Sequence, residues 1–189
     1  GKTVVLGVTG CIAAYKACEI VSSLKKKGAT VIVIMTPHST EFVQPLSFET
    51  LSGNRVITDL FDRDFDFEVE HVALAKRADV FVVAPATANT IGKIANGIAD
   101  DMLTTTIMAC KAPKIICPAM NTNMYENENT TENIARLKKQ GYKIIEPISG
   151  RLACGDVGKG KMAEPETIVK AIEDILTPNQ DFEGVRMLI

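Results

Sequence analysis

The feature that most constrains the fold is a regular alternation of short apolar runs, rich in Val and Ile, with longer segments of helical periodicity. This alternation is typical of a parallel sheet, whose strands are buried on both faces by the helices that connect them. Five strands are expected at residues 3–8, 30–35, 80–84, 114–118 and 143–146, with a weaker one at 55–57. Helices are expected at residues 13–27, 45–52, 72–77, 90–109, 130–140 and 165–176. The pattern predicts an α/β fold: a doubly wound, Rossmann-like (flavodoxin-like) parallel sheet with helices on both faces.

Length and charge narrow the class of partner. A chain of 189 residues can form one domain and bury about 70% of the surface of its unfolded form, so its core needs neither disulfide nor metal. With 21 basic and 23 acidic residues, the net charge is −2 and provides no basic surface for nucleic acid or anionic membranes. The sequence has no signal peptide and no apolar run near the roughly 20 residues of a membrane span. We expect a cytoplasmic protein that binds a small molecule, not nucleic acid or a membrane.

The cysteines and the last residues add two further expectations. The five cysteines, at positions 11, 18, 110, 117 and 154, form no C-x-x-C pair, which favours reduced thiols over disulfides or a zinc site. After the last expected helix, T-P-N-Q-D-F-E-G is typical of a linker, and V-R-M-L-I begins another apolar run. We therefore expect one domain at 1–176, followed at 177–189 by a linker and the truncated start of another domain.

The loop after the first strand, G-V-T-G-C-I-A-A-Y-K at 7–16, is a candidate anion site. Gly10 is expected to adopt a backbone conformation closed to other residues, and the amides that follow it begin a helix. A G-x-G-x-x-G motif is absent, and no acidic residue ends the second strand, which disfavours a dinucleotide. A mononucleotide phosphate and a tight turn that binds nothing both remain open.

Two further loops hold weaker candidates. Ser39 and Thr40, after the second strand, can cap the next helix or donate to the same phosphate. The acidic stretch at 61–70 lacks the glycine and the final glutamate of a calcium loop, so it is interpreted as a solvated connection. His71 begins the next helix near the expected binding edge and is a candidate for acid, base or hydrogen-bonding work.

The loops after the third and fourth strands suit a flat ring. A-P-A-T-A-N-T at 84–90 is rich in small residues, and Thr87, Asn89 and Thr90 offer donors and a helix cap. C-P-A-M-N-T-N-M-Y at 117–125 places Asn121 where its side chain can donate to a carboxylate, between two adaptable methionines. We therefore expect these loops to bind an aromatic cofactor, with a carboxylate group of a second ligand bound beside it by Asn121.

Three motifs in order resemble the signature motifs of the homo-oligomeric flavin-containing cysteine decarboxylases: P-A-T-A-N-T at 85–90, P-A-M-N-T-N-M-Y at 118–125 and L-A-C-G-D at 152–156. The resemblance implies an FMN enzyme of coenzyme A biosynthesis that converts 4′-phospho-N-pantothenoylcysteine to 4′-phosphopantetheine. FMN would oxidise the cysteine moiety, carbon dioxide would leave, and the product would be re-reduced and protonated. The departures are small: Tyr125 stands where Trp is common, and Cys11 and Thr87 stand where serine is common.

The resemblance also assigns roles to residues. It implies that His71 is the base and Cys154 the proton donor. It implies that Asn121 binds the substrate carboxylate, and that a glycine-rich mobile flap over the substrate carries Arg151, Leu152 and Ala153. The FMN contacts that it implies are Gly10, Cys11, Ile12, Ser39, Thr87, Ala88, Asn89, Thr90 and Ala119. Lys159 and Lys161 on the flap either meet the substrate phosphate or stay solvated.

The resemblance further implies assembly and partners. Trimers, often assembled into dodecamers, would hold FMN between protomers, and the tail at 185–189 would enter a covalently linked synthetase half. A peptidyl-cysteine decarboxylase, a flavin prenyltransferase and a non-enzymatic FMN-binding regulatory subunit are the alternatives. The asparagine motif, P-A-M-N-T-N-M-Y at 118–125, together with A-C-G-D disfavours the prenyltransferase. The residues at 185–189 disfavour the peptidyl-cysteine decarboxylase. The presence of both His71 and Cys154 favours an enzyme over a regulatory subunit.

Overall fold

The structure is a computed structural model that describes residues 1–60, 70–151, 155 and 157–177. Its central sheet has the strand order β2-β1-β3-β4-β5, and all neighbouring strands are parallel. This is the flavodoxin-like order, so the expected fold class is confirmed. The elements in chain order are β1 (Thr3–Val8), α1 (Ala14–Lys26), β2 (Thr30–Met35), the 3-10 helix η1 (Pro37–Glu41), α2 (Pro45–Ser52), α3 (Glu70–Arg77), β3 (Val80–Ala86), α4 (Ala88–Asn96), α5 (Met102–Ala109), β4 (Lys114–Pro118), α6 (Thr122–Glu126), α7 (Glu128–Lys139), β5 (Lys143–Ile144), β6 (Ile148–Arg151), β7 (Val157–Lys161) and α8 (Pro165–Leu176).

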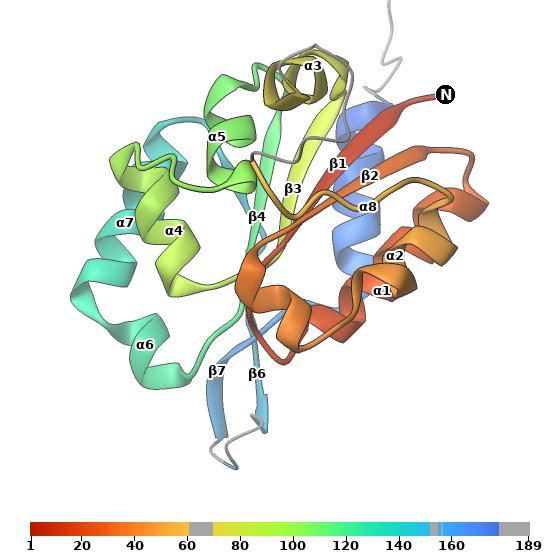
Figure 1. Cartoon of the computed structure of the whole chain (residues 1–189). Helices are drawn as coiled ribbons and strands as arrows, with labels where there is room; N and C mark the ends of the chain where they lie inside the picture. The colour runs from red at the N-terminus through yellow and green to blue at the C-terminus, as the bar shows by residue number, and fades with distance from the viewer. Residues whose placement is uncertain (61–69, 152–154, 156, 178–189) are drawn as a thin grey trace, which may run out of the picture.

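Helices cover both faces of the sheet (Figure 1), with α1, α2 and α8 on one side and α3, α4, α5 and α7 on the other. Alternate residues of each strand enter opposite cores because strand side chains point to opposite faces. In β1, Val4 and Leu6 join the core under α1 and α8, whereas Val5 joins the core under α4 and α5. Each such buried side chain contributes about 1.5–3 kcal/mol of hydrophobic stabilisation. The near-continuous apolar strands of the sequence are thus explained by two cores.

The single helix expected at 90–109 is wrong, because the chain forms two helices, α4 and α5. Gly97 ends α4 with a left-handed φ of 71°, a conformation that glycine adopts without steric cost. Asp101 then begins α5 with a capping box, accepting a hydrogen bond from the Thr104 backbone N–H at 2.8 Å. The loop between the two helices carries Asp100 and ends at Asp101.

Other boundaries differ by less. The expected strand at 55–57 is an isolated parallel bridge between Ile57 and Ile34, and the strand expected at 143–146 ends at Ile144. The helix expected at 130–140 begins earlier, as α7 at Glu128, and the sequence did not predict the short helix α6 before it.

The glycine-rich stretch expected to be a mobile flap contains an antiparallel hairpin, β6–β7, which projects from the carboxyl end of the sheet (Figure 1). Gly150 pairs with Gly158, and Ser149 pairs with Lys159. The sequence gives no strand signal here because glycines and lysines replace the alternating apolar residues on which strand prediction depends. Between Arg151 and Val157, residues 152–154 and 156 lie outside the described residues.

Across the described ranges 1–60, 70–151 and 157–177, no helix combines the length and the apolar character that crossing a membrane requires.

Candidate functional site

The carboxyl ends of β1 and β3 lie side by side and are joined by one buried hydroxyl. Thr9 donates from Oγ1 to the carbonyl oxygen of Pro85 at 2.7 Å and accepts from the backbone N–H of Thr87 at 3.0 Å. From this point the chain leaves β1 toward one face of the sheet and β3 toward the other, which makes it the topological switch point. Ligands of open α/β sheets bind in the crevice at such a point.

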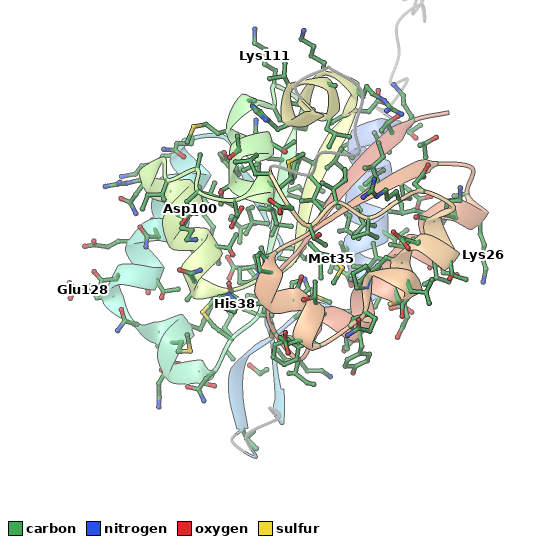
Figure 2. The ribbon with its side chains drawn as sticks, viewed as in Figure 1. Lys26, Met35, His38, Asp100, Lys111 and Glu128 are labelled. Atoms are coloured by element: carbon green, nitrogen blue, oxygen red, sulfur yellow. The ribbon has the colours of Figure 1, made fainter. Side chains whose placement is uncertain are left out.

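An open groove of about 810 Å³ lies at this switch point. It combines backbone-lined turns, hydroxyl groups and charged side chains from several loops. Figure 2 labels two residues that line it, His38 near the end of β2 and Asp100 beside α4. The lining residues are Gly10, Thr36, Pro37, His38, Glu41, Phe42, Thr87, Asn89, Thr90, Lys93, Asp100, Asp101 and Met124. Four of the nine expected FMN contacts, Gly10, Thr87, Asn89 and Thr90, are therefore brought together in one groove.

In the turn between β1 and α1, Gly10 is required for a different reason from the one expected from the sequence. Gly10 is not among the glycines with positive φ. Instead, a Cβ atom at Gly10 would lie 2.7 Å from the Cβ of His38, so glycine is required by the close approach of η1. The start of α1 has no capping side chain, and the turn uses some of its own amides: the Ala14 N–H donates to the Cys11 carbonyl oxygen at 2.9 Å and the Lys16 N–H to the Ala13 carbonyl oxygen at 3.0 Å. Burial raises the pKa of the Cys11 thiol, and backbone hydrogen bonds from Ala13 and Ile12 partly oppose this effect.

Ser39 of η1 is fully buried, and its hydroxyl already donates to the carbonyl oxygen of Thr36 at 2.7 Å. Because a serine hydroxyl has one hydrogen, Ser39 cannot at the same time donate to a phosphate from its side chain. Its neighbours Pro37 and His38 line the groove, whereas Ser39 does not. The assignment of Ser39 to FMN stays a prediction that requires this hydroxyl to turn.

The loop between β3 and α4 has the capping role expected for it. Thr87 is the N-cap of α4, and its Oγ1 accepts from the backbone N–H of Thr90 at 3.3 Å. The Thr87 hydroxyl in turn lies 3.2 Å from that of Thr90. Asn89 is exposed on the first turn and Ala88 is half-buried. This helix start therefore presents small side chains, one amide and backbone donors to the groove.

The loop between β4 and α6 carries Asn121, the residue predicted to bind the substrate carboxylate. Ala119 is buried, and its backbone N–H donates to the carbonyl oxygen of Ala86 at 3.0 Å. Asn121 caps α6 by accepting from the backbone N–H of Asn123 at 2.8 Å with its side-chain oxygen. Between them, the Met120 N–H donates to Gly160 of the hairpin at 3.0 Å. The asparagine motif is thus held between the cofactor-side loop and β7.

The structure does not bring His71 to this groove. His71 lies on α3, which packs against α5 near the beginning of β3, the opposite end of the sheet from the switch point (Figure 1). His71 is not among the residues that line the groove, and its assignment as the base stays a prediction. Of the flap residues, Arg151 ends β6, whereas Leu152, Ala153 and Cys154 lie outside the described residues.

The groove also contains charged residues that were not expected from the sequence. Lys93 of α4 donates to Asp100 at 2.8 and 2.9 Å and lies 4.0 Å from Asp101. They were not expected because the sequence predicted one continuous helix at 90–109, whereas the chain turns between α4 and α5. The lysines considered for phosphate binding are paired instead: Lys159 with Glu146 at 3.2 Å and Lys161 with Glu164 at 3.1 Å.

Comparison with known proteins agrees with the resemblance seen in the motifs. The family described as Flavoprotein matches residues 1–177. The chain is 52% identical over 172 residues to the coenzyme A biosynthesis bifunctional protein CoaBC of Bacillus subtilis, covering 91% of this chain and 42% of that protein. It is 47% identical over 177 residues to a probable phosphopantothenoylcysteine decarboxylase of Streptococcus mutans, covering 93% of this chain and 99% of that protein. The chain thus spans less than half of the bifunctional relative.

Two solved structures share the fold. One is a PPC decarboxylase mutant complexed with pantothenoylaminoethenethiol, with 35% identity, a TM-score of 0.80, and coverage of 91% of this chain and 96% of that one. The other is the FMN-dependent cysteine decarboxylase SpaF, with 30% identity, a TM-score of 0.79, and coverage of 93% and 97%. The resemblance expected from the three motifs is confirmed by these comparisons.

Proposed function

This chain belongs to the Flavoprotein family, and from that premise we propose that it binds FMN and decarboxylates 4′-phospho-N-pantothenoylcysteine to 4′-phosphopantetheine. One observation carries the proposal. The groove at the β1/β3 switch point is lined in part by two of the motifs that resemble those of the flavin-containing cysteine decarboxylases, through Thr87, Asn89 and Thr90 of the first and Met124 of the second. The names of the similar proteins, a phosphopantothenoylcysteine decarboxylase and an FMN-dependent cysteine decarboxylase, support both the reaction and the cofactor.

The residues of the groove fit FMN in their chemistry. The turn between β1 and α1 would receive the phosphate next to Gly10, where any side chain would collide with His38. Ala88 and Ala119 do not line the groove, but their small side chains would let a flat ring approach the backbone of the loops after β3 and β4, and Thr87 caps α4 beside them. Residues Gly10, Cys11, Ile12, Ser39, Thr87, Ala88, Asn89, Thr90 and Ala119 would hold the cofactor.

When bound, FMN would supply the two-electron oxidation of the cysteine moiety that makes loss of carbon dioxide feasible. The chain's own residues would bind the substrate and move protons. Asn121, held in place as the cap of α6, would orient the substrate carboxylate. His71 would remove a proton as the base, and Cys154 would return one to the product. The side chains of 151–153 would cover the substrate.

We further propose that the site is completed between copies of the chain, as trimers that assemble into dodecamers. The helix α3, which carries His71, lies at the opposite end of the sheet from the groove (Figure 1), which supports a site to which a second copy contributes. Phe42 of the groove and three large apolar side chains in the segments that follow β1 and β2, Ile12, Tyr15 and Leu46, are 48–70% exposed and suit a protein–protein contact. We also propose that residues 1–176 are the decarboxylase domain and that 177–189 lead to a synthetase domain.

The test is turnover by purified protein reconstituted with FMN, measured as release of 4′-phosphopantetheine by mass spectrometry. A peptide ending in cysteine serves as the competing substrate. We expect a flavin absorption spectrum and conversion of the phosphorylated substrate only. Conversion of the peptide alone would favour a peptidyl-cysteine decarboxylase, and FMN binding without any turnover would favour a regulatory subunit. Failure to bind FMN at all would contradict the proposal.

A further inference from the structure

A cluster of polar side chains outside the groove joins three elements to the loop that precedes β6 at the root of the hairpin. Glu146, between β5 and β6, accepts hydrogen bonds from the Tyr125 hydroxyl at 2.5 Å, from Lys138 at 2.7 Å and from Lys159 at 3.2 Å. The Lys159 ammonium also lies 5.3 Å from the centre of the Tyr125 ring, within range of a cation–π interaction. The cluster therefore connects α6, α7 and β7 through one carboxylate.

The backbone of β7 meets the asparagine motif directly beside this cluster. The Met120 N–H donates to the Gly160 carbonyl oxygen at 3.0 Å. A Cβ at Gly160 would collide with the Met120 carbonyl oxygen, and a Cβ at Gly158 would collide with the Thr122 hydroxyl. Two alternate glycines therefore let β7 lie against the residues on both sides of Asn121, with Lys159 between them reaching the cluster.

These contacts make Asn121 depend on the hairpin. Asn121 begins α6, and Tyr125 lies one turn later, with its backbone N–H donating to the Asn121 carbonyl oxygen at 3.0 Å. The Tyr125 ring packs against the core under α4 and α5, while its hydroxyl is bound by Glu146. Any movement of β7 away from Glu146 would therefore loosen the turn that carries Asn121.

We propose that Tyr125, Glu146 and Lys159 are positioning residues that hold β7 and the Asn121 turn in the geometry that binds the carboxylate of the substrate. This inference rests on the proposed function, in which Asn121 binds that carboxylate. None of the three residues lines the groove. In the protein without substrate, these three residues increase the fraction of molecules in which Asn121 is correctly placed to bind the carboxylate. Because the apparent affinity falls with that fraction, their loss raises KM more than it lowers kcat.

The test compares Tyr125→Phe and Lys159→Met with wild type, using FMN-loaded protein. Exposed pairs and cation–π contacts are individually weak, so we expect KM to rise about 3- to 10-fold while kcat changes less than about 2-fold. Lys159→Arg keeps the charge and should restore KM. The matched control is Lys27→Met, which removes the exposed Lys27–Glu173 pair between α1 and α8 and should behave as wild type.

Amide hydrogen exchange supplies a readout that does not depend on turnover. Peptides that cover 119–123 and 157–161 should exchange faster in Tyr125→Phe and Lys159→Met than in wild type, and at the wild-type rate in Lys27→Met. Unchanged KM and unchanged exchange in both variants would overturn the inference. If wild type shows no turnover, the proposed function fails, and the exchange rates alone decide whether the cluster positions the hairpin.

Discussion

The two sides of the candidate site are built by different kinds of interaction. On the cofactor side, the ends of β1 and β3 are joined by the buried Thr9 hydroxyl, and η1 packs tightly on Gly10. On the substrate side, the hairpin is held by an exposed carboxylate and by glycines that lie against the Asn121 turn. Buried hydrogen bonds are costly to lose, whereas exposed ion pairs contribute little each. We therefore expect the ends of β1 and β3 to be rigid before the cofactor binds, and the hairpin on the substrate side to move easily.

Replacing Thr9 with Val should have the largest effect. The substitution leaves the Pro85 carbonyl oxygen and the Thr87 N–H buried without their partner, which we expect to cost about 2–4 kcal/mol of unfolding free energy. Urea unfolding of the variant measures this cost. Thr9→Ser keeps the hydroxyl and serves as the control. If Thr9→Val unfolds like the serine variant, the two strand ends are not joined in the way that distinguishes the cofactor side.

Gly10→Ala tests the same side at its surface. A Cβ at Gly10 would lie 2.7 Å from the His38 Cβ, so η1 must move, and overpacking of this kind costs about 1–3 kcal/mol. We expect FMN affinity to fall about 10-fold or more, measured by titrating apoprotein with FMN. Gly92→Ala, where the nearest atom is the Asn133 amide nitrogen at 3.5 Å, is the matched control and should leave affinity unchanged.

Gly160→Ala tests the substrate side. The new methyl group would collide with the Met120 carbonyl oxygen at a backbone φ of 153°, so β7 must leave the Asn121 turn. We expect KM for the phosphorylated substrate to rise about 10-fold, while FMN affinity stays within about 2-fold of wild type. A loss of FMN affinity equal to that of Gly10→Ala would show that the two sides are one unit.

The smallest expected effect is a pH dependence that resides in Glu146. Hydrogen bonds from Lys138 and Tyr125 lower the pKa of Glu146 from 4.5 to about 2. Because the folded state binds this proton less tightly than the unfolded state, the stabilisation is complete above pH 4.5 and disappears as pH falls toward 2. The carboxylate is exposed, so its contribution should stay below about 1 kcal/mol.

Urea unfolding of wild type and Glu146→Gln across the acid range measures this contribution. The difference in unfolding free energy between them should be constant at neutral pH and shrink below pH 4.5. Glu173→Gln, which breaks the Lys27 pair, shows how much of any change is common to exposed carboxylates. A difference that is independent of pH would mean that Glu146 is not held by its partners in solution.

Much of the fold and part of the site were predictable from local sequence. The five sheet strands follow from their apolar composition, and the Thr87 cap and the Asn121 turn follow from residue type at strand ends. The break between α4 and α5 was missed, although Gly97 and the Asp101 capping box were visible, because the apolar pattern continues through them. The hairpin could not be predicted, since Gly158 and Gly160 are required only by the surface on which β7 lies.

Residues close together in the chain specify the sheet, the loops that follow each strand and the chemical groups in those loops, so these features were accessible from the sequence. Which of these groups come into contact depends on packing between distant segments. This packing brought Gly10 against His38, committed the Ser39 hydroxyl to Thr36, and placed the helix of His71 at the far end of the sheet. Contacts between distant residues depend on how helices and strands pack, and one sequence carries no direct signal of that packing.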